Sequence, residues 1–394
     1  MKFDLALQRD APKTGASQHK RIIVAAHFVR AGEVGGAEHM LYNLISGFGA
    51  HSIDLTLTCS DAGRLDPLAL AKFKEQPGLR VVETGGPEPR FLAEQRAVLR
   101  RDLDSDAVLF PNYFVPPWVP RRFGRAVTVL HDLQYRHFPQ HFTRTKRAWL
   151  RAAHSLASRR ADAVIVPSDF VRDDAIRWLG PTSERKLVKV PNPISWTRFA
   201  GSVASTRPIE RPYILSVAAQ YPHKNLDTLL RAFALVALRN RDLQLVLCGQ
   251  FPGGLRGIGG TQQALSGLAR ELAIEDRVIL TGYVNDATLG VWYNHAQAFA
   301  FPSLFEGFGM PPVEALGLGL PVITTLCAAL PEVTLGLAHL VSDPRDIEEW
   351  AQLLGATARD PDAFSPGDAA VLRLRAHYAP QRIAALYLQQ LLGC

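Results

Sequence analysis

Short apolar runs rich in Val, Ile, Leu and Ala alternate along the chain with longer stretches in which apolar residues recur every three or four positions. The short runs predict buried strands, and the longer stretches, such as Glu38–Phe48 and Phe91–Arg101, predict amphipathic helices. Alternation of this kind builds a parallel sheet that helices cover on both faces. The strands predicted in the first half are Arg21–Ala26, Ile53–Cys59, Leu79–Glu83, Ala107–Phe110, Ala126–Leu130, Ala163–Pro167 and Leu187–Val190.

The alternation stops around Pro191, and the stretch from Phe199 to Pro212 is polar and rich in Ser, Gly, Arg and Pro, which is typical of an interdomain linker. A second alternating series follows, so the sequence predicts an α/β chain of two doubly wound, Rossmann-like parallel-sheet domains facing a cleft. The carboxyl ends of the strands, where such sheets bind ligands, would line that cleft. The strands predicted in the second half are Tyr213–Val217, Leu243–Cys248, Arg277–Leu280, Ala298–Phe301, Pro321–Thr324 and His339–Val341.

The length of 394 residues exceeds what one hydrophobic core usually serves, which agrees with two domains. We place a loosely ordered lead at residues 1–20, a linker at residues 196–212 and a final helical segment at residues 376–394. The two domains predicted between these segments are residues 21–195 and residues 213–375.

The loop after the predicted strand Ala298–Phe301 has the composition of a phosphate-binding turn. Pro311 and Pro312 suit the first turn of a helix, where the missing N–H is no loss and φ is already preset. Gly307 and Gly309 leave the backbone amides of the connecting loop unobstructed. Unpaired amides at a helix start attract phosphate through their hydrogens and through the helix dipole.

Two carboxylates flank this turn, Glu306 in the loop and Glu314 in the first helical turn, eight residues apart. A carboxylate aimed at the phosphates would repel them, so each must accept hydrogen bonds from neutral hydroxyls on either side of the phosphates. A nucleotide sugar offers both, since sugar hydroxyls lie beyond the β-phosphate and ribose hydroxyls precede the α-phosphate. The alternative is an ordinary glycine-containing loop in which Glu314 only favours the helix dipole.

The loop and helix start resemble the paired-glutamate signature of retaining glycosyltransferases with the GT-B fold, family 4 in particular. The resemblance covers nearly the whole chain, and it implies that the last helix crosses back onto the first domain. It also implies that Glu306 meets the donor sugar and Glu314 the ribose. The residues implied to meet the pyrophosphate and the sugar through their backbone are Phe308, Gly309 and Met310.

Glycines and a histidine that follow other predicted strands are expected to line the same cleft. Gly35 and Gly36 open a helix after the first strand, and in the family a similar glycine-rich loop approaches the donor phosphates and the acceptor. His131 closes the strand Ala126–Leu130, where the family has a matching histidine that contacts the donor sugar near its C6 hydroxyl. The alternatives are a tight turn at the helix start and a histidine that its own neighbours satisfy.

Lys224 stands at the head of a helix after the first strand of the second domain, where its charge can neutralise a departing diphosphate. The family commonly places an Arg and a Lys here, whereas this chain has His223 in the place of that Arg. Histidine is only partly charged near pH 7, so the phosphate clamp would be weaker. Asn225 completes a Pro-x-Lys-Asn form that is frequent among relatives similar to mannosyltransferases, which favours GDP-mannose as the donor.

Gly249 and the pair Tyr283 and Val284 follow predicted strands and resemble family positions whose backbone groups flank the nucleotide base. The stretch Gly253–Gly260 is similar to a dinucleotide fingerprint, but it lacks the strand-to-helix placement and the acidic residue of that motif, so we predict a mobile loop. No Asp-x-Asp pair follows a strand, and GT-B enzymes generally need no divalent ion. We therefore expect no metal and no cofactor besides the nucleotide-sugar substrate.

The positive charge of the chain is concentrated in its first half. Residues 1–195 carry 29 Lys and Arg against 20 Asp and Glu, whereas the remainder carries 15 against 17. This asymmetry favours an anionic partner, and without a recognised nucleic-acid motif we expect an acidic membrane surface or a lipid-pyrophosphate acceptor and no nucleic acid. The basic stretch from Arg144 to Arg160 is predicted either as an amphipathic helix on anionic lipid or as a core-packed helix with a solvated basic face.

The composition is that of a globular enzyme, with 47% hydrophobic and 21% charged residues. The stretch from Met1 to Lys20 is polar, no run approaches the roughly 18 apolar residues of a spanning helix, and the four cysteines have no paired spacing. We therefore expect a cytoplasmic protein, with the inner face of the cell membrane as its place of contact.

The sequence thus predicts a metal-independent retaining hexosyltransferase, with GDP-mannose as the favoured donor and a UDP-linked sugar still open. The acceptor would be a glycan or a lipid-linked sugar in envelope polysaccharide synthesis. The main alternative is a catalytically inactive nucleotide-sugar-binding GT-B subunit, because of the replaced Arg. A GT-B phosphorylase would need a pyridoxal-phosphate lysine that no feature marks, and a nicotinamide oxidoreductase would need a fingerprint after the first strand.

Overall fold

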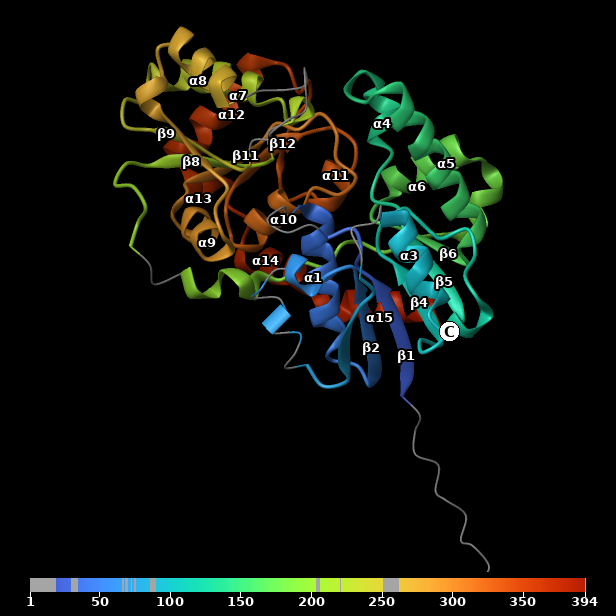
Figure 1. Cartoon of the computed structure of the whole chain (residues 1–394). Coiled ribbons are helices and arrows are strands. Elements are labelled where there is room, and N and C mark those ends of the chain that lie inside the picture. The colour runs from blue at the N-terminus through green and yellow to red at the C-terminus, as the bar shows by residue number, and fades with distance from the viewer. Residues whose placement is uncertain are drawn as a thin grey trace, which may run out of the picture.

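Two parallel sheets with helices on both faces form two lobes (Figure 1). The first sheet has the strand order β3-β2-β1-β4-β5-β6-β7, and the second has the order β10-β9-β8-β11-β12-β13. Every pair of neighbouring strands is parallel, so the prediction of two doubly wound parallel sheets is confirmed. The computed structural model describes residues 19–29, 35–65, 67, 70, 71, 73, 76–85, 90–202, 206–219, 221–250 and 262–393.

The elements lie where the apolar pattern predicted them, with strand ends that differ by one or two residues. The strands of the first sheet are β1 (Lys20–Ala25), β2 (Ile53–Cys59), β3 (Leu79–Glu83), β4 (Ala107–Phe110), β5 (Arg125–Val129), β6 (Ala163–Val166) and β7 (Leu187–Lys189). Those of the second are β8 (Tyr213–Val217), β9 (Gln244–Cys248), β10 (Val278–Gly282), β11 (Ala298–Phe301), β12 (Val322–Thr325) and β13 (His339–Val341). The helices are α1 (Gly36–Phe48), α3 (Arg90–Leu99), α4 (Gln134–His137), α5 (Arg144–Arg160), α6 (Asp169–Leu179), α7 (Leu226–Ala237), α8 (Gln262–Glu271), α9 (Asp286–His295), α10 (Met310–Gly317), α11 (Leu330–Val333), α12 (Ile347–Arg359), α13 (Pro361–Phe364), α14 (Asp368–His377) and α15 (Pro380–Leu392).

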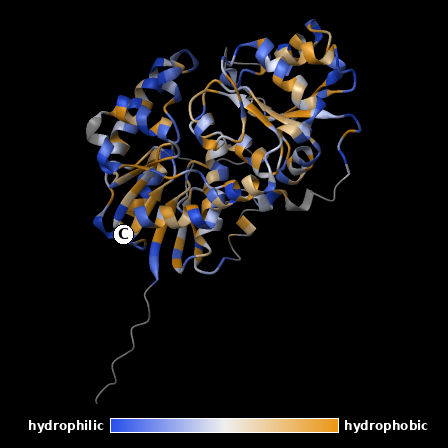
Figure 2. Ribbon diagram, turned by 180° about the vertical axis from the view of Figure 1, so that it is seen from behind, coloured by the Kyte–Doolittle hydropathy of each residue, from blue (hydrophilic) through white to orange (hydrophobic). Residues whose placement is uncertain are grey.

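Each sheet has a hydrophobic core on both of its faces. The central strands β4 and β11 are buried along their whole length, which their unbroken apolar sequences permit. Figure 2 shows the apolar residues gathered on the strands, with polar residues on the outer faces of the helices. Removal of these apolar runs from water stabilises each lobe around its own sheet.

The last helix, α15, packs against the first lobe although it follows the second in the sequence (Figure 1). Its residues Ile383, Tyr387 and Leu391 are fully buried in the same core as α1 and β1. The Nε of Arg125 donates a hydrogen bond of 2.8 Å to the carbonyl oxygen of Gln390. The end of the chain therefore ties the second lobe to the first.

The first part of the segment predicted as a linker packs against the second lobe. Residues Trp196–Ser202 form a 3₁₀ segment, and Phe199 is buried in the core of the second lobe beside Tyr293. A Cβ atom at Gly317 of α10 would lie 2.1 Å from the ring nitrogen of Trp196, so the two segments are in close contact. This part of the connection belongs structurally to the second lobe.

Helix α5 is the basic helix for which the sequence left two interpretations open. Leu150 and Ala157 are buried in the first lobe, whereas Arg144 and Arg151 are exposed. The structure therefore shows a core-packed helix with a solvated basic face, and its apolar side is not available to a lipid surface.

Some predictions fall on residues that the structure does not describe. These are the lead up to residue 18, the stretch Gly253–Gly260 and Cys394. The other cysteines are free thiols, buried at Cys59 and Cys248 and half-buried at Cys327. Within the described ranges, the helices lack the combination of length and apolar character that crossing a bilayer requires.

Replacing Gly47 by Ala is expected to destabilise the packing of α15 on α1 by about 1–3 kcal/mol or more. The added Cβ atom would lie 2.2 Å from the carbonyl oxygen of Pro380, so backbone must shift. Urea unfolding measures the change. The matched control is Gly267→Ala in α8, which meets no atom within 4 Å and should leave stability unchanged or slightly higher.

Candidate active site

A cavity of about 380 Å³ lies between the two lobes, within the range of small-molecule sites, roughly 300–1,000 Å³. Residues Glu306 to Met310, which join β11 to α10, line it from the second lobe. From the first lobe it is lined by residues that follow β4 and β5, by the start of α1 and by one side of α5. The carboxyl ends of both sheets therefore meet at this cavity, as expected for doubly wound sheets.

The loop from Glu306 to Gly309 is held against the first lobe. A Cβ atom at Gly307 would lie 2.0 Å from the carbonyl oxygen of His131, so only glycine permits this approach. The hydroxyl of Ser168 donates a hydrogen bond of 2.7 Å to the carbonyl oxygen of Gly307. Gly309 has a φ of +85° and directly precedes α10, whose first turn contains two prolines as predicted.

Lys224 and Glu306 form an ion pair beside the cavity. The Nζ of Lys224 lies 2.5 Å from Oε1 of Glu306, and each side chain keeps 14% of its surface exposed. The 3₁₀ turn Pro222–Lys224 after β8 carries the lysine, and β8 is the neighbour of β11 in the sheet. The two side chains predicted to meet the diphosphate and the donor sugar are thus in direct contact.

Asn225 supports the turn that carries Lys224. Its side-chain Nδ2 donates to the carbonyl oxygens of Pro302, at 3.2 Å, and Pro344, at 2.7 Å. Its Oδ1 accepts a hydrogen bond of 2.8 Å from the hydroxyl of Thr228. The side chain therefore ties this turn to the loop after β11.

His131 follows β5 and lines the cavity. Its Nε2 lies 2.9 Å from the carbonyl oxygen of Pro111, which can only accept, so Nε2 carries the proton and Nδ1 the lone pair. Burial lowers the pKa of His131 to about 4, although the bond to Pro111 acts in the opposite direction. The imidazole is therefore neutral near pH 7 and offers an acceptor to a hydroxyl.

His223 is buried and neutral as well. Its Nδ1 lies 2.8 Å from Nε2 of Gln134, an amide group that only donates, so Nδ1 accepts a hydrogen bond from the first lobe. Burial, followed by the charge of Lys224, lowers the pKa of His223 to about 2. His223 therefore does not supply the positive charge of the Arg whose place it takes, and Lys224 is the cation of this turn.

Glu314 lies in α10 beyond its first turn, so its predicted place in the first turn is wrong. It has 2% of its surface exposed and is not among the described residues that line the cavity. The Nη2 of Arg198 donates to its Oε1 at 2.6 Å, and the hydroxyl of Tyr293 donates to its Oε2 at 3.2 Å. Burial raises the pKa of Glu314, and the charge of Arg198 opposes that shift. Both oxygens are engaged with protein groups, so a ribose would have to share or displace these partners.

Arg198 joins the two lobes, a role that no sequence pattern indicated. Its Nη1 lies 2.7 Å from Nδ1 of His39 in α1 and 3.4 Å from Oδ1 of Asp286 in α9. Burial, followed by the charge of Arg198, lowers the pKa of His39 to about 3, so this ring is neutral. Nothing in the polar stretch around Arg198 marks an arginine that reaches helices of both lobes.

Four further predicted donor residues lie at the same sheet edges, outside the described lining of the cavity: Gly35, Gly249, Tyr283 and Val284. The N–H of Gly35 donates to the Glu38 side chain at 3.1 Å, and the neighbouring Gly36 does line the cavity. Gly249 has a φ of +147°, and a Cβ atom there would lie 1.9 Å from a backbone carbonyl oxygen just after β8. The packing of these strand ends therefore requires glycine at this position. Tyr283 is exposed after β10.

The first-lobe side of the cavity carries aromatic and neutral polar side chains. The rings of Tyr113 and His154 lie 4.7 Å apart and edge to face, and both residues line the cavity. Burial lowers the pKa of His154 to about 3, and its Nε2 has no hydrogen-bond partner among the described residues. The Oδ1 of Asn192, another lining residue, is likewise unpaired within the described chain. Such a surface suits a ligand with apolar faces and hydroxyl groups.

Within the described part of the chain, no three His, Cys, Asp or Glu side chains lie close enough together to hold a metal ion. The positive charges beside the two glutamates come from protein side chains, Lys224 at Glu306 and Arg198 at Glu314.

Comparison with known proteins agrees with this architecture. The family model described as "Glycosyltransferase Family 4" matches residues 34–198, and the one described as "Glycosyl transferases group 1" matches residues 202–363. The solved structure of sucrose-phosphate synthase from Thermosynechococcus elongatus matches with a TM-score of 0.75 and 20% identity, over 94% of this chain and 98% of that chain. The fold is therefore that of the two-lobed GT-B glycosyltransferases.

The curated relatives point to the same class. The O-antigen chain mannosyltransferase B of Escherichia coli is 29% identical over 246 residues, 60% of this chain and 61% of that protein. The O-antigen chain mannosyltransferase RfbU of Salmonella typhimurium is 26% identical over 247 residues, 63% of this chain and 64% of that protein. The chain thus matches less than two thirds of the length of these relatives. It belongs to the group 1 glycosyltransferases of the GT-B fold, which confirms the family indicated by the glutamate loop.

Replacing Arg198 by Met is expected to destabilise the protein by about 3–5 kcal/mol at pH 8, because the carboxylate of Glu314 stays buried without its cation. Burial raises the pKa of Glu314 in the folded state and Arg198 opposes that shift, so without Arg198 the pKa rises further and the folded variant binds this proton more tightly than the wild type does. The loss should therefore shrink as the pH falls toward about 5. Urea unfolding across this pH range measures it.

The double variant Arg198→Met, Glu314→Gln is the matched control, since it removes both charges of the pair. It should recover most of the lost stability at pH 8. A loss that does not change with pH, or that the second substitution leaves unrepaired, would contradict the buried ion pair.

Proposed function

We propose that the protein is a retaining glycosyltransferase that moves a hexose, with GDP-mannose as the first candidate donor, onto a glycan or lipid-linked acceptor of an envelope polysaccharide. The observation that carries the proposal is the 2.5 Å contact between Lys224 and Glu306 beside a cavity that His131 also lines. This arrangement offers a cation to a diphosphate and hydrogen-bond acceptors to a sugar. The two relatives that are mannosyltransferases support the choice of sugar.

The diphosphate of the donor would lie between Lys224 and the first turn of α10. When the bond between C1 and the diphosphate oxygen breaks, its electron pair stays on the departing phosphate, where the largest new charge develops. Lys224 and the backbone N–H groups of Phe308, Gly309 and Met310 would stabilise that charge, and the dipole of α10 acts in the same direction. Because His223 is neutral, Lys224 supplies the side-chain charge of its turn.

Glu306 and His131 would hold the donor sugar while C1 has positive character. The charge of Glu306 stabilises an oxocarbenium-like centre, and its oxygens accept hydrogen bonds from sugar hydroxyls. His131 accepts a further hydrogen bond on Nδ1, because its Nε2–H is already given to Pro111. The ion pair with Lys224 makes Glu306 a poorer nucleophile, so we assign it a binding and electrostatic role rather than a covalent one.

The acceptor would enter from the first-lobe side of the cavity, along Tyr113 and His154. Its hydroxyl oxygen bonds to C1 on the face that the phosphate leaves, and its proton passes to the departing phosphate oxygen. One C1–O bond replaces the other on the same face, so the configuration at C1 is retained. No separate protein base is needed for this step.

The proposed place of action is the cytoplasmic side of a membrane. The exposed basic face of α5, with Arg144 and Arg151, lies on the helix that also lines the acceptor side of the cavity through Lys146 and His154. Basic residues near an anionic lipid surface are attracted by about 1 kcal/mol each. This face would bring the cavity toward lipid-linked acceptors without inserting apolar side chains.

A nucleotide-sugar-binding subunit without transfer activity is the alternative, and one observation favours it. His223 is buried and neutral at the place where the family commonly has an Arg. Donor hydrolysis at high enzyme concentration separates the two functions. A transferase should release sugar slowly to water, whereas an inactive subunit should release none above the level of a Glu306→Ala variant.

Thermal unfolding in the presence of UDP-, GDP- and ADP-sugars tests the donor. A ligand that binds only the folded protein raises its melting temperature, and at 100 times its Kd it adds about 2.7 kcal/mol of stability. We expect the largest rise with GDP-mannose. If none of these compounds changes the melting temperature, the cavity does not bind a nucleotide sugar and the proposal fails.

Substitutions of Glu306 and Glu314 should affect different steps, namely turnover and nucleotide binding. Glu306→Ala should slow turnover by roughly 10²–10³-fold, since it removes charge stabilisation at the reacting carbon. Glu314→Ala leaves Arg198 without its buried partner and so also lowers stability, but in the folded protein it should weaken nucleotide binding by about tenfold, which corresponds to a typical lost hydrogen bond, and leave turnover largely unchanged. Turnover with saturating donor and calorimetric nucleotide Kd measure the two effects independently.

Glu348→Ala, which removes an exposed carboxylate in α12, is the control for these variants and should change neither quantity. Wild-type turnover and wild-type nucleotide affinity in both site variants would refute the assignment of the glutamates.

A further inference from the structure

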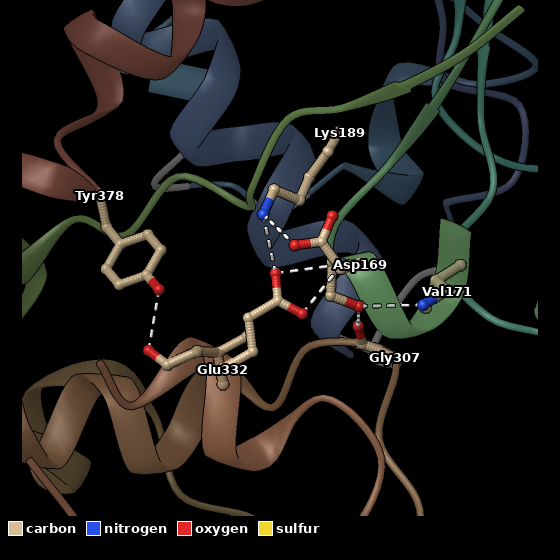
Figure 3. A network of polar contacts seen from close by, with 8 residues as sticks. Asp169, Val171, Lys189, Gly307, Glu332 and Tyr378 are labelled. Carbon is tan, nitrogen blue, oxygen red and sulfur yellow. Dashed lines mark hydrogen bonds and ion pairs between the residues drawn. The ribbon is translucent and has the colours of Figure 1, made fainter. Parts of the chain in front are cut away.

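The start of α6 in the first lobe is the place where the second lobe docks beside the active-site loop (Figure 3). Ser168 is the N-cap of α6, and its hydroxyl accepts a hydrogen bond of 3.3 Å from the N–H of Val171. The same hydroxyl donates to the carbonyl oxygen of Gly307 at 2.7 Å. One buried side chain therefore caps the N-terminus of a helix in the first lobe. The same side chain holds the loop of the second lobe that carries Glu306.

Glu332 of α11 secures the same junction from the second lobe (Figure 3). Its two carboxylate oxygens lie 3.0 and 2.9 Å from the backbone nitrogen of Asp169, which donates to them. The Nζ of Lys189 lies 3.2 Å from Glu332 and 2.5 Å from the Asp169 side chain. A carboxylate at a helix N-terminus is favoured by the helix dipole, so this position on the first lobe attracts Glu332.

The two sets of contacts differ in burial. The side chains of Lys189, Asp169 and Glu332 keep 41%, 57% and 31% of their surface exposed, so water and salt weaken their attraction. Ser168 has none of its surface exposed, and a buried hydrogen bond is costly to leave unmade. The charged contacts can guide the lobes together, whereas the buried hydroxyl fixes the geometry of the loop.

The peptide groups on either side of Gly307 are held by different lobes. The carbonyl oxygen of Glu306 accepts from the N–H of Ala329 at 3.3 Å, within the second lobe. The carbonyl oxygen of Gly307 accepts from Ser168 of the first lobe. The orientation of the Glu306 backbone is thus fully fixed only when the first lobe is in place.

We propose that Ser168 is a positioning residue for glycosyl transfer, because its hydrogen bond to Gly307 orients Glu306 toward the donor sugar when the two lobes are closed. The inference rests on the proposed function, since it takes Glu306 to act on a donor sugar in this cavity. A donor bound to the second lobe alone would meet a loop without this bond. Closure of the lobes, which also brings the acceptor side into place, completes it.

Ser168→Ala tests the inference. The kcat for transfer should fall about 10- to 100-fold, the effect of a misplacement of roughly 1 Å, while the KM for the donor changes little. Ser168→Thr keeps a hydroxyl at the same position and should restore most of kcat. A higher KM for the donor with an unchanged kcat would overturn the proposal, because positioning acts on the reacting geometry rather than on binding.

Two controls separate positioning from general destabilisation. Ser105→Ala removes another buried hydroxyl, which donates to the carbonyl oxygen of Phe123 at 3.1 Å within the first lobe. Asp346→Ala removes the N-cap of α12, away from the cavity. Neither variant should lower kcat at a temperature where all are folded. An equal fall in kcat for Ser105→Ala and Ser168→Ala would overturn the proposal.

Hydrogen exchange provides a readout that needs no substrate. The amides of residues 304–309 should exchange faster in Ser168→Ala than in the wild type, and they should be unchanged in Ser105→Ala. Unchanged exchange in this loop of Ser168→Ala would overturn the proposal whatever the kinetics show. A wild type that transfers no sugar, combined with faster loop exchange in Ser168→Ala, would refute the proposed function and still support the positioning contact.

Discussion

The docking of the loop Glu306–Gly309 between the two lobes is the constraint on which the active site depends. Lys224 holds the Glu306 side chain from within the second lobe, while Ser168 and the carbonyl of His131 meet Gly307 from the first. Each lobe has its own sheet and cores, yet neither contains a complete site. The chemistry therefore depends on one arrangement of the lobes, which polar contacts at the junction, the last helix and Arg198 all help to fix.

Burial determines which side chains around the cavity are neutral and which are charged. His131, His154 and His223 are kept neutral because a buried imidazolium would be poorly solvated, so they serve as hydrogen-bonding groups near pH 7. Positive charge comes instead from Lys224, which forms an ion pair with Glu306. In the proposed function, a diphosphate would meet the charge of Lys224, and sugar hydroxyls would meet the neutral His131 together with the carboxylate of Glu306.

The fold and part of the site followed from local sequence patterns. Apolar runs located the strands because a parallel strand covered on both faces admits few polar residues, as β4 and β11 illustrate. The glycines and prolines around Glu306 indicated a strand, a turn and a helix start, and the structure has all three. Ser168, the N-cap of α6 after β6, was not among the predicted residues, and its local sequence carried no sign of a contact with Gly307.

By itself, the sequence determined which segments form strands and helices, and which residues stand at the carboxyl ends of the strands, because these properties depend on neighbours a few positions away. Only the tertiary structure decided the partners: Arg198 at the buried Glu314, Gln134 at a neutral His223, and Ser168 at Gly307. Each of these hydrogen bonds joins residues far apart in the chain. Its formation depends on how the two lobes, each with its own hydrophobic cores, pack against each other and on which groups that packing buries. No short stretch of sequence contains this information.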